Sequence, residues 1–243
     1  METVQVRNPE EVTQRGADII RSSAAESIAL RGRFCLALSG GSTPWAMLRQ
    51  LAQPAIERKT EVENSIDWRR VHLFQVDERV APDGHSDRNL TRLLDTISGT
   101  ALEAAIIHPM PVTAPDLITA AQDYESLLAS HAGSPAVLDL VHLGLGSDGH
   151  TASLVPDDPV LDRTDCDVAL AGPYQGRRRM TLTYRAINRA RQILWLVTGD
   201  KKSSALEQWC AGNPKIPAVK VETRNAILVT DCRAISLPES RLK

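Results

Sequence analysis

A segment rich in hydroxyl groups and glycine has the composition of an anion-binding turn. Its members are Ser39, Gly40, Gly41, Ser42, Thr43 and Pro44. Two glycines let the backbone turn tightly and expose its N–H groups. Thr43 is expected to cap a helix that starts at Pro44, and the free N–H groups of that helix end favour a phosphate. The alternative is an ordinary capped turn; no Walker A Lys-Ser or Lys-Thr pair follows.

Three charged residues, Asp77, Glu78 and Arg79, directly follow the apolar run 71–76 (VHLFQV). Such a triplet could simply solvate a loop. The functional interpretation places a carboxylate near a reacting centre and an arginine near an oxyanion or a phosphate.

A glycine-rich turn, 144–150 (GLGSDGH), follows the apolar run 138–143 and ends in His150. Its GxGxxG spacing also occurs in dinucleotide-binding proteins, but Pro156 and Pro159 leave no room for the helix that such a site needs. His150 could be a capping or core histidine. Beside Asp148, however, it is well suited to proton transfer, because histidine titrates near neutral pH and a carboxylate can orient it.

Basic residues further along could close over a bound phosphate. Arg179 opens the segment RMTLTY, and Lys201 and Lys202 follow Gly199 at the start of an expected helix. Each could be merely solvated, but together they could form a cationic clamp. The sequence leaves open which of the two lysines would meet the phosphate.

Histidine and cysteine spacings do not predict a metal site or a disulfide framework. No HxxxH, CxxC or mixed Cys/His spacing occurs among the histidines at 72, 85, 108, 131, 142 and 150 and the cysteines at 35, 166, 210 and 232. The cysteines are therefore expected to be reduced thiols, as in a cytoplasmic protein.

Alternating apolar segments must position these residues. Strands are expected over 33–38, 71–76, 138–143, 180–184, 193–198 and 226–230, and helices over 9–31, from 44, and over 87–95, 114–131 and 202–209. This order predicts a three-layer α/β fold, with a mostly parallel Rossmann-like sheet and helices on both faces. In such sheets ligands bind at the carboxyl ends of the strands, where the polar segments fall. One domain over 1–243 is expected, with a polar excursion at 53–67.

Composition narrows the possible partners. The chain has 243 residues, with 28 Lys and Arg against 30 Asp and Glu, giving a formal charge of −2. A near-neutral chain argues against nucleic acid or an anionic membrane as a partner. No apolar run reaches the ~20 residues of a membrane span, and the start lacks the apolar region of a secretory signal. A cytoplasmic location is expected, and the oligomeric state is left open.

Several blocks together resemble the 6-phosphogluconolactonases. They are SGGSTP at 39–44, DER at 77–79, GLGSDGHTASL at 144–154, RMTLT at 179–183 and LVTGDKKSSAL at 196–206. The resemblance implies hydrolysis of 6-phospho-D-glucono-1,5-lactone, the second step of the oxidative pentose phosphate pathway. It implies the fold of the glucosamine-6-phosphate deaminases and requires no metal or cofactor. The small-molecule partner is then a sugar-phosphate lactone.

The expected site combines the motifs with this resemblance. His150 is the expected general base, with Asp77 or Asp148 orienting it and Arg79 or the backbone of the turn 144–149 holding the oxyanion. The expected substrate and phosphate contacts are Ser39, Gly40, Gly41, Ser42, Thr43, Asn89, Gly146, Arg179 and Lys202.

Two other functions share parts of this pattern. An amino-sugar-phosphate deaminase or isomerase would usually carry Asn-Glu-Pro after the histidine, where this chain has 153–156 (SLVP). A sugar-phosphate sensor would usually carry a DNA-binding helix-turn-helix, for which there is no room ahead of residue 33. The chain also departs from the lactonase pattern: Arg88 stands where a serine is usual, Val155 replaces a Phe, and 222–225 lacks the usual Pro and Gly.

Overall fold

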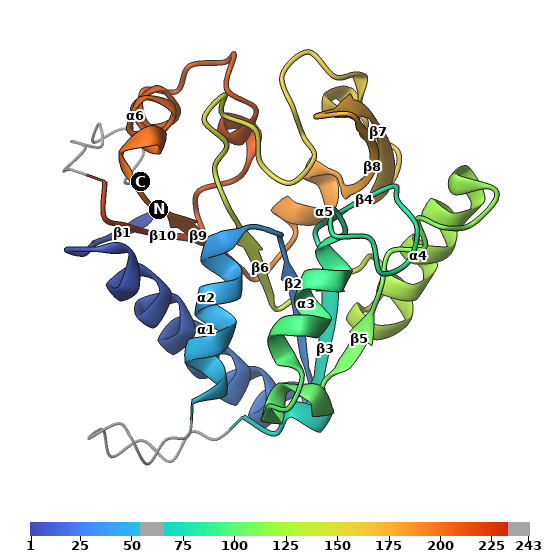
Figure 1. The fold of residues 1–243 in the computed structure, drawn as a ribbon, viewed down its shortest axis with the longest axis horizontal. Helices are drawn as coiled ribbons and strands as arrows, with labels where there is room; N and C mark the ends of the chain where they lie inside the picture. The colour runs from blue at the N-terminus through green and yellow to red at the C-terminus, as the bar shows by residue number, and fades with distance from the viewer. Residues whose placement is uncertain (54–65, 233–243) are drawn as a thin grey trace.

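A parallel sheet forms the middle of the molecule in the computed structural model, which describes residues 1–53 and 66–232 (Figure 1). Every neighbouring pair of strands in it is parallel. From one edge to the other the strands are β1 (Glu2–Gln5), β10 (Ala226–Thr230), β9 (Gln192–Val197), β6 (Leu140–Leu143), β2 (Phe34–Leu38), β3 (Val71–Gln75) and β5 (Ile106–His108). The predicted fold class is confirmed.

Helices cover both faces of this sheet, as the apolar patterns predict. Three of them pack on one face: α1 (Pro9–Arg31), α2 (Ser42–Ala52) and α3 (Asn89–Ile97). On the opposite face lie α4 (Leu117–Ala132), α5 (Tyr184–Asn188) and α6 (Ser203–Cys210). Strand side chains alternate between the two cores, so Leu36 packs towards α1 and α2 while Cys35 and Ala37 pack on the other side.

A second, antiparallel sheet was not predicted. Its strands are β4 (Asp77–Arg79), β8 (Arg177–Leu182) and β7 (Val168–Tyr174), in that order. The charged triplet, expected to follow the strand 71–76, is itself a short strand, and β8 ends before the expected 180–184 strand does. Strand β7 contains Gly172 and Pro173, which ordinarily indicate a turn.

Helix starts differ from the sequence expectation by a few residues. The helix expected from Pro44 begins at Ser42, and its N-cap is Gly41 rather than Thr43. Gly41 has a φ of 130°, a conformation that side-chain-bearing residues rarely adopt, so the glycine makes the turn. Helices α3 and α4 begin two and three residues later than expected, at Asn89 and Leu117.

Short 3₁₀ turns complete the described elements. They are Trp68–Arg70, Ala101–Ala104, Pro159–Asp162, Asp200–Lys202 and Pro217–Lys220. The polar excursion expected at 53–67 falls mostly outside the described residues. No described helix has the combined length and apolar character needed to cross a membrane.

Candidate active site

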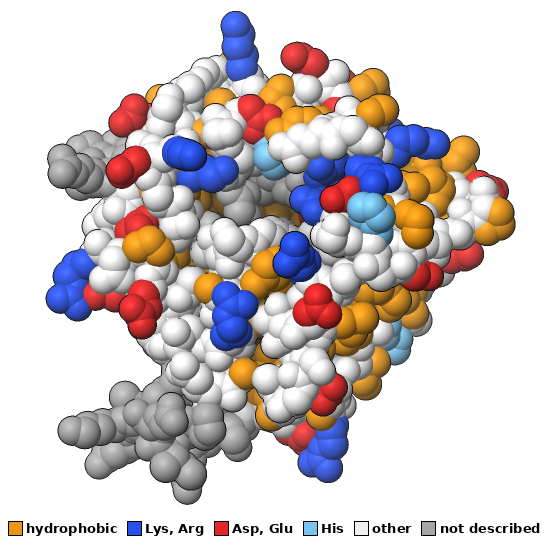
Figure 2. Space-filling model, in the orientation of Figure 1, with side chains coloured by type: hydrophobic (Ala, Val, Ile, Leu, Met, Phe, Trp, Pro, Cys, Tyr) orange, Lys and Arg blue, Asp and Glu red, His pale blue; other side chains and the backbone are white. Residues whose placement is uncertain are grey.

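A cavity of about 300 Å³ lies beyond the carboxyl ends of β2, β6 and β9. It is where the parallel sheet predicts a ligand site. This face of the molecule is hollowed, and Lys and Arg side chains gather around the hollow (Figure 2). The structure brings all but one of the expected site residues to its lining, namely Ser39, Gly40, Gly41, Ser42, Thr43, Asp77, Arg79, Asn89, Gly146, His150, Arg179 and Lys202.

The glycine-rich loop follows β2 and passes into α2, with its backbone against Asn89. A Cβ placed on Gly40 would lie 2.0 Å from Oδ1 of Asn89, so a glycine is required there. The Ser39 hydroxyl is buried and lies 3.1 Å from Nδ1 of His142. The loop therefore combines a helix N-terminus, hydroxyl groups and a close packing partner, a combination that suits an anion.

His150 and Asp148 form a side-chain pair at the cavity. Nδ1 of His150 lies 2.6 Å from Oδ1 of Asp148, which also accepts the backbone N–H of His150 at 3.2 Å. A Cβ on Gly146 would lie 2.0 Å from His150 Nδ1, so this glycine makes room for the pair. Asp148 is the one expected site residue outside the cavity lining, and it contacts the Nδ1 side of the imidazole.

Asp77, the other carboxylate considered as a partner for His150, has different contacts. It is buried and accepts the Ser153 hydroxyl at 2.6 Å and the Asn89 side-chain amide at 3.4 Å. A guanidinium nitrogen of Arg179 lies 3.8 Å away. Asp77 thus contacts Arg179 and the turn that contains Ser153, and the carboxylate that contacts His150 is Asp148.

Three cations, Arg79, Arg179 and Lys202, face the cavity against the single carboxylate of Asp77. The Nε atoms of both arginines are buried and have no hydrogen-bond partner within the described part of the chain. Lys202 lines the cavity, whereas Lys201 is exposed and does not. Three cations against one carboxylate make the cavity lining electropositive, as suits an anionic ligand.

Part of the glycine-rich turn is unavailable as an oxyanion hole. The N–H of Gly146 donates to the carbonyl of His150 at 2.7 Å, and that of Gly149 donates to the carbonyl of Gly146 at 3.0 Å. Arg79, the other expected source of oxyanion donors, lines the cavity and donates from Nη1 to the carbonyl of Asp87 at 2.7 Å.

The chain after this turn excludes the dinucleotide alternative. Residues 151–158 form tight turns with a Thr151–Leu154 bridge, and no helix follows β6 directly. The helix N-terminus that would hold a pyrophosphate is absent at this point of the described chain.

Glu78 and Arg88 do not line the cavity, but they hold the start of α3, which carries Asn89. Glu78 is fully buried and accepts the backbone N–H groups of Asn89 and Leu90 at 2.8 and 2.9 Å. Nε of the buried Arg88 lies 3.0 Å from the same carboxylate. The arginine that departs from the family pattern thus neutralises the carboxylate that holds the start of α3.

Tyr174 contacts two of the expected site residues, although no motif in the sequence points to it. Its hydroxyl donates to Oδ2 of Asp148 at 2.9 Å, and its ring lies 5.0 Å beneath the guanidinium carbon of Arg179. The only available signal was a tyrosine close to Arg179 in the chain, which is too common to be informative. Ser153 was not predicted either, because its contact is with Asp77, which is far away in the sequence.

Local interactions tune two ionisable groups of the site. Burial raises the pKa of Asp148, but the hydrogen bonds from His150 and Tyr174 and the histidine charge outweigh it, so the pKa lies below its usual value. Burial lowers the pKa of Arg179, and the charge of Asp77 partly compensates. The histidine therefore faces an ionised carboxylate at neutral pH.

Fold and site together define an α/β protein with an electropositive pocket at the carboxyl edge of a parallel sheet. Residues 7–230 match the family model of glucosamine-6-phosphate isomerases/6-phosphogluconolactonase. The chain belongs to this family.

Individual relatives agree with this assignment. The chain is 38% identical over 207 residues to a 6-phosphogluconolactonase of Synechocystis sp., covering 82% of this chain and 80% of the relative. It is 36% identical over 199 residues to the human GDH/6PGL endoplasmic bifunctional protein, covering 79% of this chain and only 24% of that longer protein. A crystal structure of a 6-phosphogluconolactonase from Shewanella baltica is similar with a TM-score of 0.78 and 25% identity, covering 95% of this chain and 97% of the other.

Proposed function

We propose that this chain is a 6-phosphogluconolactonase, which hydrolyses 6-phospho-D-glucono-1,5-lactone to 6-phospho-D-gluconate in the oxidative pentose phosphate pathway. The observation that carries the proposal is one cavity that unites a histidine–carboxylate pair with a phosphate-type loop and three cations. The names of the relatives support the same reaction. The whole chain would act as one α/β domain, and its four free cysteines support a cytoplasmic location.

The phosphate of the substrate would bind at the N-terminus of α2. Its oxygens would accept the N–H and hydroxyl groups of the loop and the charges of Arg179 and Lys202. The contributing loop residues are Ser39, Gly40, Gly41, Ser42 and Thr43. Asn89 and Gly146 would line the space for the sugar ring.

The lactone would then be hydrolysed by general acid–base catalysis. Nδ1 of His150 faces Asp148, so Nε2 is free to take a proton from water as the water oxygen bonds to the lactone carbonyl carbon. The carbonyl electron pair moves to its oxygen, where Arg79 would stabilise the oxyanion. When the tetrahedral intermediate collapses, the bond from carbon to the ring oxygen breaks, and His150 returns the proton to that oxygen.

The deaminase alternative lacks a residue that it would need. The turn 151–156 presents no carboxylate, and Ser153 within it is engaged by Asp77. A deaminase would need such an acid to assist opening of the sugar ring before its reaction. A lactone is itself the cyclic ester that is hydrolysed, so its hydrolysis does not need this acid.

The test is a coupled assay of 6-phosphogluconate formation from freshly generated lactone, corrected for spontaneous hydrolysis. Unphosphorylated glucono-1,5-lactone is the matched substrate. Because each charged hydrogen bond to the phosphate contributes ~1.5–3 kcal/mol, we expect kcat/KM for it to be lower by at least about 100-fold. Equal kcat/KM for the two lactones would contradict the phosphate site, and turnover of glucosamine 6-phosphate alone would favour the deaminase.

A further inference from the structure

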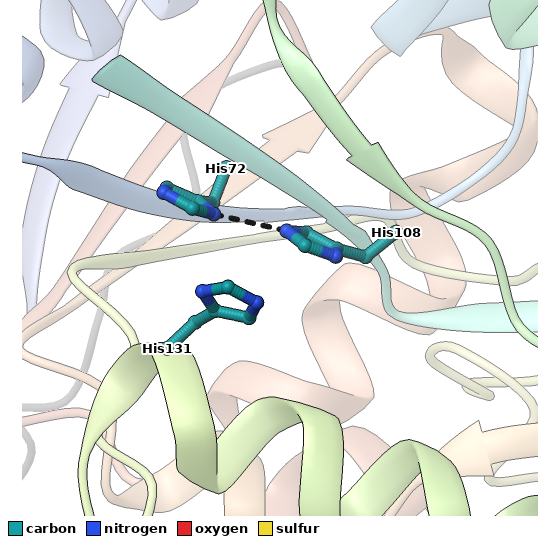
Figure 3. A group of neighbouring side chains, drawn as sticks. All are labelled: His72, His108 and His131. Carbon is teal, nitrogen blue, oxygen red and sulfur yellow. Dashed lines mark hydrogen bonds between the residues drawn. The ribbon is translucent and has the colours of Figure 1, made fainter.

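Three histidines from separate parts of the chain meet on the α4 side of the sheet (Figure 3). His72 lies near the start of β3, His108 ends β5, and His131 is in the last turn of α4. One ring nitrogen of each lies within 4.8 Å of the other two. Their separations along the chain follow no metal-binding spacing, so the sequence did not predict the cluster.

Strand register and helix packing bring the cluster together. In the parallel β3–β5 pair, His72 is opposite Ile106 and Phe74 is opposite His108, so both histidines project from the same face of the sheet. Nδ1 of His72 lies 2.9 Å from Nε2 of His108. The ring of His131 packs over both, with its centroid 4.6 and 4.5 Å from theirs.

The contact between His72 and His108 leaves a ring nitrogen available to a metal ion. A hydrogen bond between two ring nitrogens needs an unprotonated nitrogen as its acceptor, so at least one of the two imidazoles is neutral. Neutral imidazole is the metal-binding form. His72 and His131 are partly exposed, so an ion can reach the cluster from solvent. None of the three histidines is among the residues that line the catalytic cavity.

We propose that His72, His108 and His131 bind one Zn²⁺ ion, with water as the fourth ligand. Zn–N bonds of ~2.0–2.1 Å place ligand nitrogens about 3.3 Å apart in tetrahedral geometry, so small side-chain rotations would close the site. In the hydrogen bond between His72 and His108, one ring donates its proton. When the ion binds, that proton moves to the other nitrogen of the donor ring, and no net proton is released.

Neighbouring groups define what kind of site this is. Cys35 is opposite His72 in the sheet, but its thiol donates to the backbone carbonyl of His131 at 3.6 Å. Cys35 is therefore not one of the three side chains that meet in the cluster. Arg33 is close enough to lower the pKa of His72, and its charge limits the affinity for a cation. The bound ion would pin the end of α4 to the edge strand β5.

The test titrates Zn²⁺ alone into the full-length metal-free chain by calorimetry and uses Co²⁺ as a spectroscopic probe. We expect one Zn²⁺ per chain, a tetrahedral Co²⁺ spectrum and a rise in Tm with Zn²⁺. Replacing a ligand by H131N should weaken binding more than the roughly 10–100-fold lost with an outer partner. H72N should do the same, while H85N and H150N are matched controls that should retain binding.

A second measurement needs no variant. A crystal of the wild-type chain soaked in Zn²⁺ should show an anomalous peak within bonding distance of the three imidazoles. The proposal is overturned if Zn²⁺ does not bind at millimolar concentration, or if the peak lies only at His150 and Asp148. It is equally overturned if H150N abolishes binding while folded H131N retains it.

Discussion

The hydroxyl of Tyr174 donates a 2.9 Å hydrogen bond to Asp148, whose other carboxylate oxygen lies 2.6 Å from the imidazole of His150. The same tyrosine ring lies under the guanidinium of Arg179. Tyr174 thus touches both the acid–base pair and a cation proposed to bind the phosphate. It can position the two parts of the site relative to each other.

Removal of this hydroxyl alone should affect the chemical step. In Y174F the aromatic ring stays beneath Arg179, so we expect KM to change little. Loss of one hydrogen bond of ~0.5–1.5 kcal/mol to the carboxylate should lower kcat by about 2- to 13-fold. Y184F is the control, because the Tyr184 hydroxyl donates to the carbonyl of Pro217, outside the cavity lining. A large rise in KM with unchanged kcat would contradict this positioning role.

Replacement of the proposed general base should be more severe. General base assistance contributes ~10²–10⁴-fold, so H150A should lower kcat by about that factor and leave KM nearly intact. D148N should lower kcat less, because it keeps the contact but removes the negative charge. Steady-state kinetics, with the spontaneous rate subtracted, measure both. Wild-type kcat in H150A would remove the histidine from the mechanism.

Arg179 should matter for substrate binding. Loss of its charged hydrogen bond to the phosphate costs ~1.5–3 kcal/mol, so R179A should raise KM by roughly 10- to 150-fold. R178A is a neighbouring control, because Arg178 does not line the cavity. Inorganic phosphate should raise the Tm of the wild type and of R178A, but much less that of R179A. Equal shifts in all three proteins would place the phosphate elsewhere.

The buried pair of Arg88 and Glu78 predicts a stability effect. R88S would leave the fully buried Glu78 carboxylate without its cation, and breaking a buried pair in this way costs about 3–5 kcal/mol. D83A removes an exposed carboxylate that also pairs with Arg88, and it should cost at most ~1 kcal/mol. Urea denaturation measures both free energies of unfolding. A neutral R88S would show that the carboxylate tolerates burial alone.

Buried His142 should make the protein acid-sensitive. Burial lowers its pKa from 6.5 to about 3, so the folded state keeps it neutral while the unfolded state gains a proton. The contribution is complete above pH ~6.5 and is lost as the pH falls towards 3, by at most ~1.4 kcal/mol per pH unit. H142Q should flatten the pH dependence of the free energy of unfolding over this range. An unchanged slope would assign the acid sensitivity to other groups.

The elements predicted best are those with continuous apolar runs. The strand Ala226–Thr230 and the helix Pro9–Arg31 match their predictions, because a buried strand and a long amphipathic helix have strong patterns. Strand β1 has four residues, three of them exposed, and β5 has only three residues, so neither has a detectable pattern. Their strand form depends on pairing with β10 and β3, which no local sequence reports.

Site residues could be predicted where glycines and polar side chains cluster within one short segment. The loop 39–44 and the turn 144–150 carry their own glycines and polar groups, so they were identifiable. Contacts between distant segments of the chain could not be predicted from such local patterns. The choice of Asp148 over Asp77 depends on where Ser153 and Arg179 lie, and the histidine cluster depends on the register of β3 and β5.

The pairing of β1 with β10 has a consequence for how the chain is made. Thr3 lies opposite Leu228, so β1 is synthesised long before β10, the strand with which it pairs. At ~5–20 residues per second on the ribosome, the interval is on the order of 10–45 s. An unpaired apolar strand would be prone to aggregate over such a time. The sequence ETVQ, with exposed Glu2 and Gln5, suits a strand that must stay hydrated until its partner emerges.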